Sequence, residues 1–287
     1  MSARVLDGKA VSQTVRNEVK GEVDRFVSKH GRRPGLEVIL VGENAASVIY
    51  TRNKEKAANE VGIRGVLHTL PETTSESDVL ALLDRLNQDD AVDGILVQLP
   101  LPKHINEARV LESINPKKDV DGFHAINAGL LLSGRPNLVP CTPLGCMRLI
   151  QESGVDLTGA HAVVVGRSNI VGKPVAQLLL AKHATVTMAH SKTRDLPGLC
   201  RSADVLVAAV GRAELVRGEW VKPFAVVIDV GINRIQDGDK SRVVGDVAYA
   251  EAAEVAGAIT PVPGGVGPMT IAYLLHNTVR AATLRSG

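Results

Sequence analysis

The sequence has 287 residues, a formal net charge of +2 and 22% charged residues, which predicts an ordinary folded protein of about two domains. With 2% aromatic residues and no cluster of lysine and arginine, it lacks the basic, stacking surface typical of nucleic-acid-binding proteins. No apolar run approaches the roughly 20 residues of a membrane span, and the first residues lack the apolar segment of a secretory signal.

Cysteine and histidine usage gives no indication of a metal site or a disulfide framework. Cys141, Cys146 and Cys200 occur without a C-x-x-C spacing, which favours reduced thiols in a reducing compartment. The histidines are scattered, and no two of them have a metal-ligand spacing beside cysteine or acidic residues. We therefore expect a cytoplasmic protein that binds no metal.

Short apolar strands alternate along the chain with amphipathic helices. The β-branched runs that end in glycine, proline or polar residues predict buried parallel strands at 35–42, 93–100, 161–166, 184–190, 204–211, 224–231 and 257–262. Helical patterns lie at 11–27, 47–62, 75–88 and 142–154, and a last helix is expected to follow Pro268. Ser75 is predicted to cap the third helix and Thr142 the fourth, where Pro143 takes the first turn. Such alternation predicts an α/β fold with right-handed crossovers.

The helix at 47–62 places a lysine on its apolar side. Its outer face is charged, and its inner face is apolar except for Ser47, Tyr50 and Lys54. Lysine is almost never fully buried without a partner. Either the stem of Lys54 is covered while its ammonium reaches water, or this lysine serves a functional site, and the helix by itself is more typical of the first arrangement.

Polar residues follow the strand at 93–100. Gln98 lies at its carboxyl end, where open parallel sheets bind ligands, and could hold a lysine or a substrate amide, or only cap neighbouring backbone groups. Downstream, the loop PKKDVDGFH contains Asp119 and Asp121. A buried carboxylate there could bind a heterocycle with adjacent N–H donors, although the loop alone is typical of a surface turn.

The strongest local motif is HAVVVGRSNIVGKPVAQLLL at 161–180. A strand ends at Gly166, a loop follows, Gly172 closes it and Pro174 opens a helix. A glycine-lined loop before a helix N-terminus lets backbone N–H groups approach a pyrophosphate. The spacing is G-x-S-x-x-x-G rather than G-x-G-x-x-G, so a plain strand-to-helix turn stays open as the alternative.

The strand that follows favours NADP over NAD. Enzymes that select NAD place an acid about 20 residues after the glycine loop to bind the ribose hydroxyls. Here the strand ends in AHSKT, with His190, Ser191 and Lys192 and no acid, while Arg167 lies inside the glycine loop. Positive and hydroxyl groups suit a 2′-phosphate, unless these residues are simply solvated.

Two further segments stand out near the C-terminus. Residues 232–246 contain DGD between two short β-type runs, which predicts a hairpin arm and a candidate dimer contact. Residues 260–270, TPVPGGVGPMT, repeat the order of strand, glycine loop, proline and helix. Glycines there would let the backbone press against a flat ligand, or they only shape a tight return.

Together these motifs resemble the bifunctional methylenetetrahydrofolate dehydrogenase/methenyltetrahydrofolate cyclohydrolase family. The resemblance covers nearly the whole chain through six motifs in order: Tyr50 and Lys54 in Y-x-x-x-K, QLPLP at 98–102, KDVDG at 118–122, PCTP at 140–143, GRSNIVGKP at 166–174 and PGGVGPMT at 263–270. It implies two α/β domains around a cleft, the second a Rossmann-type parallel sheet. Residues 1–140, completed by the helix at 268–287, would bind folate, and residues 141–267 would bind NADP.

The same resemblance implies roles for individual residues. Tyr50 would stack on the folate rings, Lys54 would be the general acid/base, and Gln98 would hold it in place. Asp121 would bind the N–H groups of the pterin, with Ser47 as a minor contact. The NADP site would be lined by Gly166, Arg167, Ser168, Gly172, Ser191 and Ile232. The loop that closes over the ligands would be Pro263, Gly264, Gly265, Val266 and Gly267.

The implied reaction is NADP-dependent oxidation of 5,10-methylenetetrahydrofolate to the methenyl cation, followed by hydrolysis to 10-formyltetrahydrofolate. A homodimer through the cofactor domain and a role in one-carbon metabolism and purine biosynthesis are also implied. Other classes stay open: a shikimate-type NADP dehydrogenase with its own catalytic lysine, a non-catalytic dinucleotide sensor, and an enzyme in which Lys54 forms a Schiff base.

Overall fold

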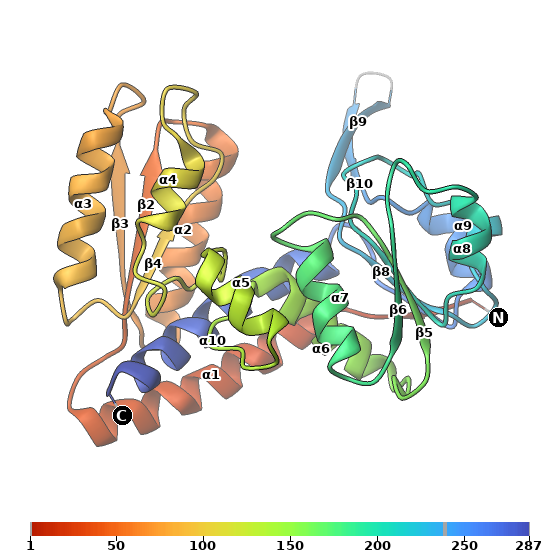
Figure 1. Ribbon diagram of the computed structural model, residues 1–287, viewed down its shortest axis with the longest axis horizontal. Coiled ribbons are helices and arrows are strands. Elements are labelled where there is room, and N and C mark those ends of the chain that lie inside the picture. Colours follow the sequence, from red (N-terminus) through yellow and green to blue (C-terminus); the bar gives the residue numbers. More distant parts are fainter. Residues whose placement is uncertain (1, 238–239, 287) are drawn as a thin grey trace. The chain divides into compact units, whose positions relative to one another are not determined.

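The computed structural model describes residues 2–237 and 240–286, and its chain divides into two units (Figure 1). One unit comprises Met1–Ser12 and Thr142–Thr270, and the other comprises Gln13–Cys141 and Ile271–Gly287. None of the helices among the described residues is long and apolar enough to cross a lipid bilayer.

The unit containing 142–270 is built on a six-stranded sheet whose paired strands all run parallel. The strand order is β1-β11-β8-β7-β5-β6. The strands are β1 (Arg4–Val5), β5 (His161–Val165), β6 (Thr185–Ala189), β7 (Val205–Ala208), β8 (Val226–Asp229) and β11 (Ala258–Ile259). The helical segments are α6 (Cys141–Ser153), α7 (Gly172–Leu180), α8 (Leu196–Arg201), η1 (Gly218–Trp220) and α9 (Tyr249–Val255). Because the chain leaves β5 for β6 on one side and returns to β7 on the other, the sheet has the switch point of a Rossmann-type fold.

The other unit contains a three-stranded parallel sheet in the order β3-β2-β4. Its strands are β2 (Gly35–Val41), β3 (Arg64–Leu70) and β4 (Gly94–Val97). Its helices are α2 (Ala45–Glu60), α3 (Glu76–Gln88), α4 (Glu107–Glu112) and α5 (Ala125–Leu132), with most of α1 (Gly8–His30) and α10 (Val266–Ser286). Apolar side chains of β2 and β4 pack against α3 in one core, which includes Ile39, Leu83 and Ile95.

The α/β class and the Rossmann-type sheet are confirmed, but the sequence missed two strands. β1 pairs with β11 at the sheet edge, Arg4 opposite Ala258, so residues 1–12 belong with 142–270 and not with the domain expected at 1–140. β1 has two residues and its partner lies near the other end of the chain, so no local pattern predicts it. β3 is half-buried along most of its length, and its mixed sequence RGVLHTL forms no continuous apolar run.

The predicted helix starts had mixed outcomes. Ser75 caps α3 as predicted, since its Oγ accepts the Asp78 N–H at 3.2 Å. Thr142 does not cap α6, which begins one residue earlier, and its hydroxyl instead lies 3.0 Å from the Thr270 hydroxyl. α10 begins at Val266, so Pro268 lies inside its first turn, where the missing N–H costs no helical hydrogen bond.

The hairpin predicted at 232–246 is confirmed. β9 (Asn233–Asp237) and β10 (Lys240–Val244) pair antiparallel, with Asn233 opposite Val244. The predicted turn residues Gly238 and Asp239 lie outside the described residues.

A buried lysine joins the segment before Asp121 to the end of α3. Lys118 is 1% exposed, and its Nζ donates to the carbonyl oxygens of Leu86, Asn87 and Asp89 at 2.9, 2.8 and 2.7 Å. These are carbonyls at the C-terminus of α3, where a cation also interacts favourably with the helix dipole. The lysine of KDVDG therefore anchors the loop that carries the two aspartates.

A buried carboxylate ties α10 to the base of the smaller sheet. Asp93 is fully buried, and its oxygens accept from Arg32 at 2.6 and 2.9 Å, from Arg285 at 2.9 Å and from the Gly35 N–H at 2.9 Å. Removing one member of a buried ion pair is costly because it leaves an uncompensated buried charge.

Asp93→Ala is expected to lower the free energy of unfolding by about 3 kcal/mol, because two guanidinium groups and one buried N–H lose their partner. Chemical denaturation followed by circular dichroism would measure this. Asp90→Asn is the matched control, since Asp90 meets the same Arg285 at 3.4 Å but is fully exposed, and it should unfold like the wild type. An Asp93→Ala transition that coincides with that of the wild type would contradict the expectation.

Candidate active site and cofactor site

The inner face of α2 carries a buried lysine. The predicted apolar residues of this face, Ala57, Ala58 and Val61, are buried, and Lys54 itself is 5% exposed. Ser47 lies half-buried in the first turn of α2, where its backbone N–H donates to Asn44 Oδ1 at 3.2 Å.

Two neighbours hold the ammonium of Lys54. Its Nζ donates a 3.0 Å hydrogen bond to Gln98 Oε1 and lies 4.6 Å from the centroid of the Tyr50 ring, a cation–π contact. Gln98 is oriented in turn, because its Nε2 donates to the Leu99 carbonyl at 2.7 Å. An ammonium held in this way does not extend to surface water, so the interpretation of Lys54 as a surface-reaching lysine is wrong.

Burial changes the protonation behaviour of Lys54. Loss of hydration lowers the pKa of Lys54 below its ordinary value, while the negative charge of Asp121 partly opposes this shift. A lysine with a lowered pKa gives up its proton more readily than an exposed lysine does.

The KDVDG turn holds two carboxylates in different environments. Asp119 accepts four hydrogen bonds, from the backbone N–H groups of Gly122, Phe123 and His124 that follow it and from Asn127 Nδ2 of α5. Asp121 receives no hydrogen bond from any residue that the structure describes. Desolvation raises the pKa of Asp121 to about 6, and the positive charge of Lys54 opposes the rise. The oxygens of Asp121 are therefore available to a ligand with N–H donors.

The C-terminal helix fixes the backbone beside Asp121. Asn277 is fully buried, and its Nδ2 donates to the carbonyls of Val120 and Val139, both at 2.8 Å. Gly122 has φ +73°, and a Cβ there would lie 2.6 Å from the Pro140 nitrogen. The PCTP segment and the KDVDG turn are thus held in close contact.

The glycine-rich loop shapes the N-terminus of α7. Ser168 Oγ accepts the N–H groups of Val171 and Gly172 at 3.2 and 3.3 Å. Gly166 has φ +130°, and a Cβ at this position would overlap the Ala209 carbonyl, whereas a Cβ at Gly172 would overlap the Gly166 carbonyl. Only glycine fits at both places, so the helix N-terminus approaches the end of β5, where its N–H groups favour a phosphate.

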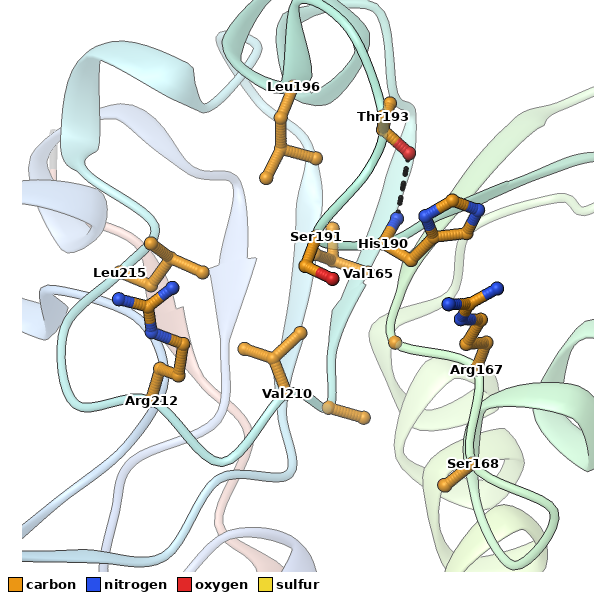
Figure 2. Close-up of a pocket in the computed structure, with 12 residues that line it drawn as sticks. Val165, Arg167, Ser168, His190, Ser191, Thr193, Leu196, Val210, Arg212 and Leu215 are labelled. Atoms are coloured by element: carbon orange, nitrogen blue, oxygen red, sulfur yellow. Dashed lines mark hydrogen bonds between the residues drawn. The ribbon is translucent and has the colours of Figure 1, made fainter.

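A cavity of about 420 Å³ lies at the carboxyl ends of β5, β6 and β7 (Figure 2). Four of the predicted cofactor residues line it, namely Gly166, Arg167, Ser168 and Ser191. Gly172 supports the loop without lining this cavity. Ile232 lies elsewhere, 68% exposed, and a Cβ at Gly267 would be 4.0 Å from its Cδ1.

The donors around this cavity fit a 2′-phosphate. His190 Nδ1 accepts the Lys192 N–H at 3.1 Å, which leaves the proton of the neutral ring on Nε2. Arg167 and Ser191 add a guanidinium and a hydroxyl, and no carboxylate of the described residues lines the cavity. This donor set suits NADP, which carries a phosphate where NAD has a hydroxyl.

The second glycine loop packs against the start of α1. A Cβ at Gly8 would overlap the Gly265 carbonyl, and Gly264 has φ +105°. Pro263 is exposed, while Val266 is buried and begins α10. The loop from Pro263 to Gly267 is therefore fixed by backbone contact at one end and by a helix at the other.

Sequence reasoning missed the wall of the cavity that faces Arg167. Figure 2 shows Arg212 on the opposite side from Arg167, with Val210 and Leu215 near it. These residues follow β7 and belong to no glycine motif. The available signal was their position just after the buried run VLVAAV, at the switch-point edge of the sheet.

Comparison with known proteins assigns the family. A model of the tetrahydrofolate dehydrogenase/cyclohydrolase catalytic domain matches residues 6–121, and one of the NAD(P)-binding domain of that family matches residues 140–286. The chain belongs to the tetrahydrofolate dehydrogenase/cyclohydrolase family. The sequence-based resemblance is thereby confirmed over both units.

Individual relatives agree with this assignment. The bifunctional protein FolD of Sorangium cellulosum (strain So ce56) is 61% identical over 99% of this chain and 99% of its own length. The bifunctional FolD methylenetetrahydrofolate dehydrogenase/cyclohydrolase of Campylobacter jejuni has a TM-score of 0.94 at 48% identity, covering 99% of this chain and 100% of the relative. The Trypanosoma brucei enzyme, solved with NADP cofactor and inhibitor, has a TM-score of 0.94 at 41% identity, covering 100% and 99%.

The shikimate-type alternative is supported at the level of fold alone. Shikimate 5-dehydrogenase from Thermus thermophilus covers 87% of this chain and 99% of its own, with a TM-score of 0.51 at 14% identity.

Arg167→Ala is expected to raise the KM for NADP⁺ by roughly tenfold to a hundredfold, the usual worth of a hydrogen bond to a charged group. Use of NAD⁺ should stay almost unchanged, because NAD⁺ lacks the 2′-phosphate. Steady-state kinetics with both cofactors would measure the difference. Arg201→Ala is the control, since Arg201 is exposed in the last turn of α8 and does not line the cavity. Equal kinetics of the wild type with both cofactors would contradict the assignment.

Proposed function

We propose that Lys54 is the acid/base of the hydrolytic step of a bifunctional folate enzyme. The chain is an NADP-dependent methylenetetrahydrofolate dehydrogenase and methenyltetrahydrofolate cyclohydrolase of one-carbon metabolism. The observation that carries the role of Lys54 is its buried ammonium, 5% exposed and hydrogen-bonded to Gln98 at 3.0 Å. A dinucleotide sensor would have no use for such a group.

The remaining folate contacts are proposed from the same geometry. Tyr50 offers a ring face beside Lys54 on which a pterin can stack. Asp121 offers two carboxylate oxygens to the N–H groups of the pterin, and Ser47 lies one turn before Tyr50. The loop Pro263–Gly267 would cover the bound ligands, and Ile232 lies beside Gly267.

NADP is the cofactor, and we assign it to the cavity at the end of β5. Arg167, Ser191 and the Nε2–H of His190 would bind its 2′-phosphate, while the backbone from Gly166 to Gly172, including Ser168, would hold its pyrophosphate. When bound, NADP⁺ supplies the acceptor for the hydride of the methylene carbon. The protein supplies alignment.

The hydrolytic step explains why a lysine is needed. Water adds to the cationic methenyl carbon and must lose a proton, and the ring nitrogen that leaves must gain one. A lysine whose pKa is lowered can accept the first proton and deliver the second. Gln98 would keep Nζ in place, and Asp121 would limit how far the pKa falls.

We also propose that the enzyme is a cytoplasmic homodimer and that its product serves purine biosynthesis. The hairpin of β9 and β10 is the candidate contact, because its strand edges can pair with those of a second copy across a two-fold axis. Light scattering of the intact protein at micromolar concentration should give the mass of a dimer, and deletion of residues 236–241 should lower it.

Lys54→Met is expected to lower cyclohydrolase activity by a factor on the order of 100 or more, the usual worth of a positioned acid/base. The variant should fold, since methionine fills similar space on an apolar helix face. Hydride transfer needs no proton from the protein, so dehydrogenase activity should persist to the extent that substrate alignment does.

The test follows methenyl hydrolysis by its absorbance beside NADPH formation. Lys56→Met is the matched control, because Lys56 lies on the exposed face of the same helix. Wild-type hydrolysis by Lys54→Met would refute the role of Lys54.

The pKa of Asp121 predicts an acid limb in the folate kinetics. The ionised carboxylate accepts N–H groups, so kcat/KM for methylenetetrahydrofolate should fall as the pH drops through about 6, by up to tenfold per pH unit. Asp121→Asn should lower the plateau and abolish this limb. Asp84→Asn, an exposed aspartate of α3, should keep the wild-type profile. An unchanged limb in Asp121→Asn would assign it to another group.

A further inference from the structure

A fully buried carboxylate, Asp246, lies behind the cofactor cavity at the end of the segment 232–246 and belongs to none of the six family motifs. It follows β10 and is 0% exposed. Its Oδ2 accepts the backbone N–H groups of Val210 and Gly211 at 2.6 and 2.9 Å, and its Oδ1 accepts that of Arg212 at 2.8 Å. Three consecutive N–H groups that converge on one anion form the arrangement that elsewhere binds phosphate, here filled by a side chain.

These three residues belong to the wall of the cavity opposite the glycine-rich loop. Val210 and Arg212 line the cavity directly (Figure 2). Gly211 has φ +65° with no atom within 4 Å of a Cβ position, so the loop turns sharply in open space. Val210 packs against the core of this unit, whereas Gly211 has no side chain to pack and is held through the bond of its N–H to Asp246.

The same carboxylate reaches a second segment. Asn233 Nδ2 donates to Asp246 Oδ1 at 2.9 Å, directly after Ile232. The backbone of Asp246 is itself held, since its N–H donates to Asp229 Oδ1 at 2.8 Å and that of Val247 to Asp229 Oδ2 at 2.9 Å. Asp229 thus fixes Asp246, and Asp246 fixes the loop.

We propose that Asp246 is a positioning residue for NADP, which sets the 210–212 wall of the cavity through three backbone N–H groups. The proposal rests on the assignment of this cavity to the cofactor. A carboxylate is required at position 246, because N–H donors point at both of its side-chain oxygens and each oxygen must accept. An asparagine would turn its own NH₂ group toward one pair of these donors and leave buried N–H groups without an acceptor.

Asp246→Asn should therefore raise the dissociation constant of NADPH at least tenfold, measured by fluorescence titration at a temperature where circular dichroism shows the variant folded. The KM for methylenetetrahydrofolate at saturating NADP⁺ should stay within twofold of wild type. Asp204→Asn is the matched control. Asp204 also accepts a backbone N–H of this sheet, that of His161 at 2.8 Å, but His161 does not line the cavity, so NADPH affinity should not change.

Gly211→Ala keeps the test decisive if Asp246→Asn does not fold. Gly211 is exposed, so alanine removes no buried contact, yet it disfavours the φ +65° conformation that Asp246 holds. It should weaken NADPH binding, and the double variant should lose less affinity than the product of the two single losses, since both act on one loop. Folded Asp246→Asn, or Gly211→Ala, with wild-type NADPH affinity would overturn the proposal.

Arg167→Ala separates this proposal from the assignment of the cavity. If Arg167→Ala also leaves NADPH affinity unchanged, the cofactor lies elsewhere and the assignment of the cavity fails. If Arg167→Ala weakens binding and Asp246→Asn does not, the assignment stands and only the role of Asp246 fails.

Discussion

Loops at the ends of parallel strands need partners for their backbone N–H groups, and in this protein buried aspartates meet that need. A buried N–H without an acceptor costs about as much as a lost hydrogen bond, and a buried carboxylate without donors costs more. The two costs cancel where backbone N–H groups donate to a buried carboxylate. Asp119 does this for the turn that leads to Phe123, and Asp246 does it for the loop after β7. Asp229 adds a third such centre, where it accepts the N–H groups of Gly231 and Val247. The loops that carry these N–H groups are thus shaped from inside the protein by buried carboxylates.

Asp119 and Asp121 lie in one turn but differ in their hydrogen bonds. Both carboxylates lose hydration, and burial raises the pKa of each. Asp119 is compensated by three N–H groups of its own turn and by Asn127 of α5, whereas Asp121 receives no hydrogen bond from the described residues and interacts instead with the charge of Lys54. Asp119 therefore shapes the turn, while the oxygens of Asp121 keep their capacity to accept hydrogen bonds. Two further side chains fix the same turn. Asn277 donates to the Val120 carbonyl, and Lys118 ties the start of the turn to the end of α3.

Features that depend on a contiguous stretch of sequence could be predicted, whereas features that depend on contacts between distant segments could not. Five of the six strands of the Rossmann-type sheet, the cap at Ser75 and the inward position of Lys54 follow from local sequence patterns, and NADP follows from the missing acid near Ser191. β1 could not be predicted, because two residues carry no pattern and their partner is Ala258–Ile259. The burial of the Lys54 ammonium also depends on Gln98 and Tyr50, whose contact with it only the fold creates. Asp246 gave no signal at all, since an aspartate after a β-type run is typical of a surface turn.

Desolvation links these features to the reaction. Burial lowers the pKa of Lys54 and also makes its positive charge costly if no partner is near. The partners of Nζ must therefore stabilise the ammonium without raising its pKa back to the ordinary value. Gln98 provides an uncharged acceptor and Tyr50 a ring face, and both are weaker partners than a carboxylate in direct contact. An aspartate at position 98 would form a salt bridge with Lys54, raise its pKa and keep the proton on Nζ. A neutral amide at the end of β4 therefore suits the proposed role of Lys54 in exchanging a proton, and the ring of Tyr50 beside Nζ is likewise uncharged.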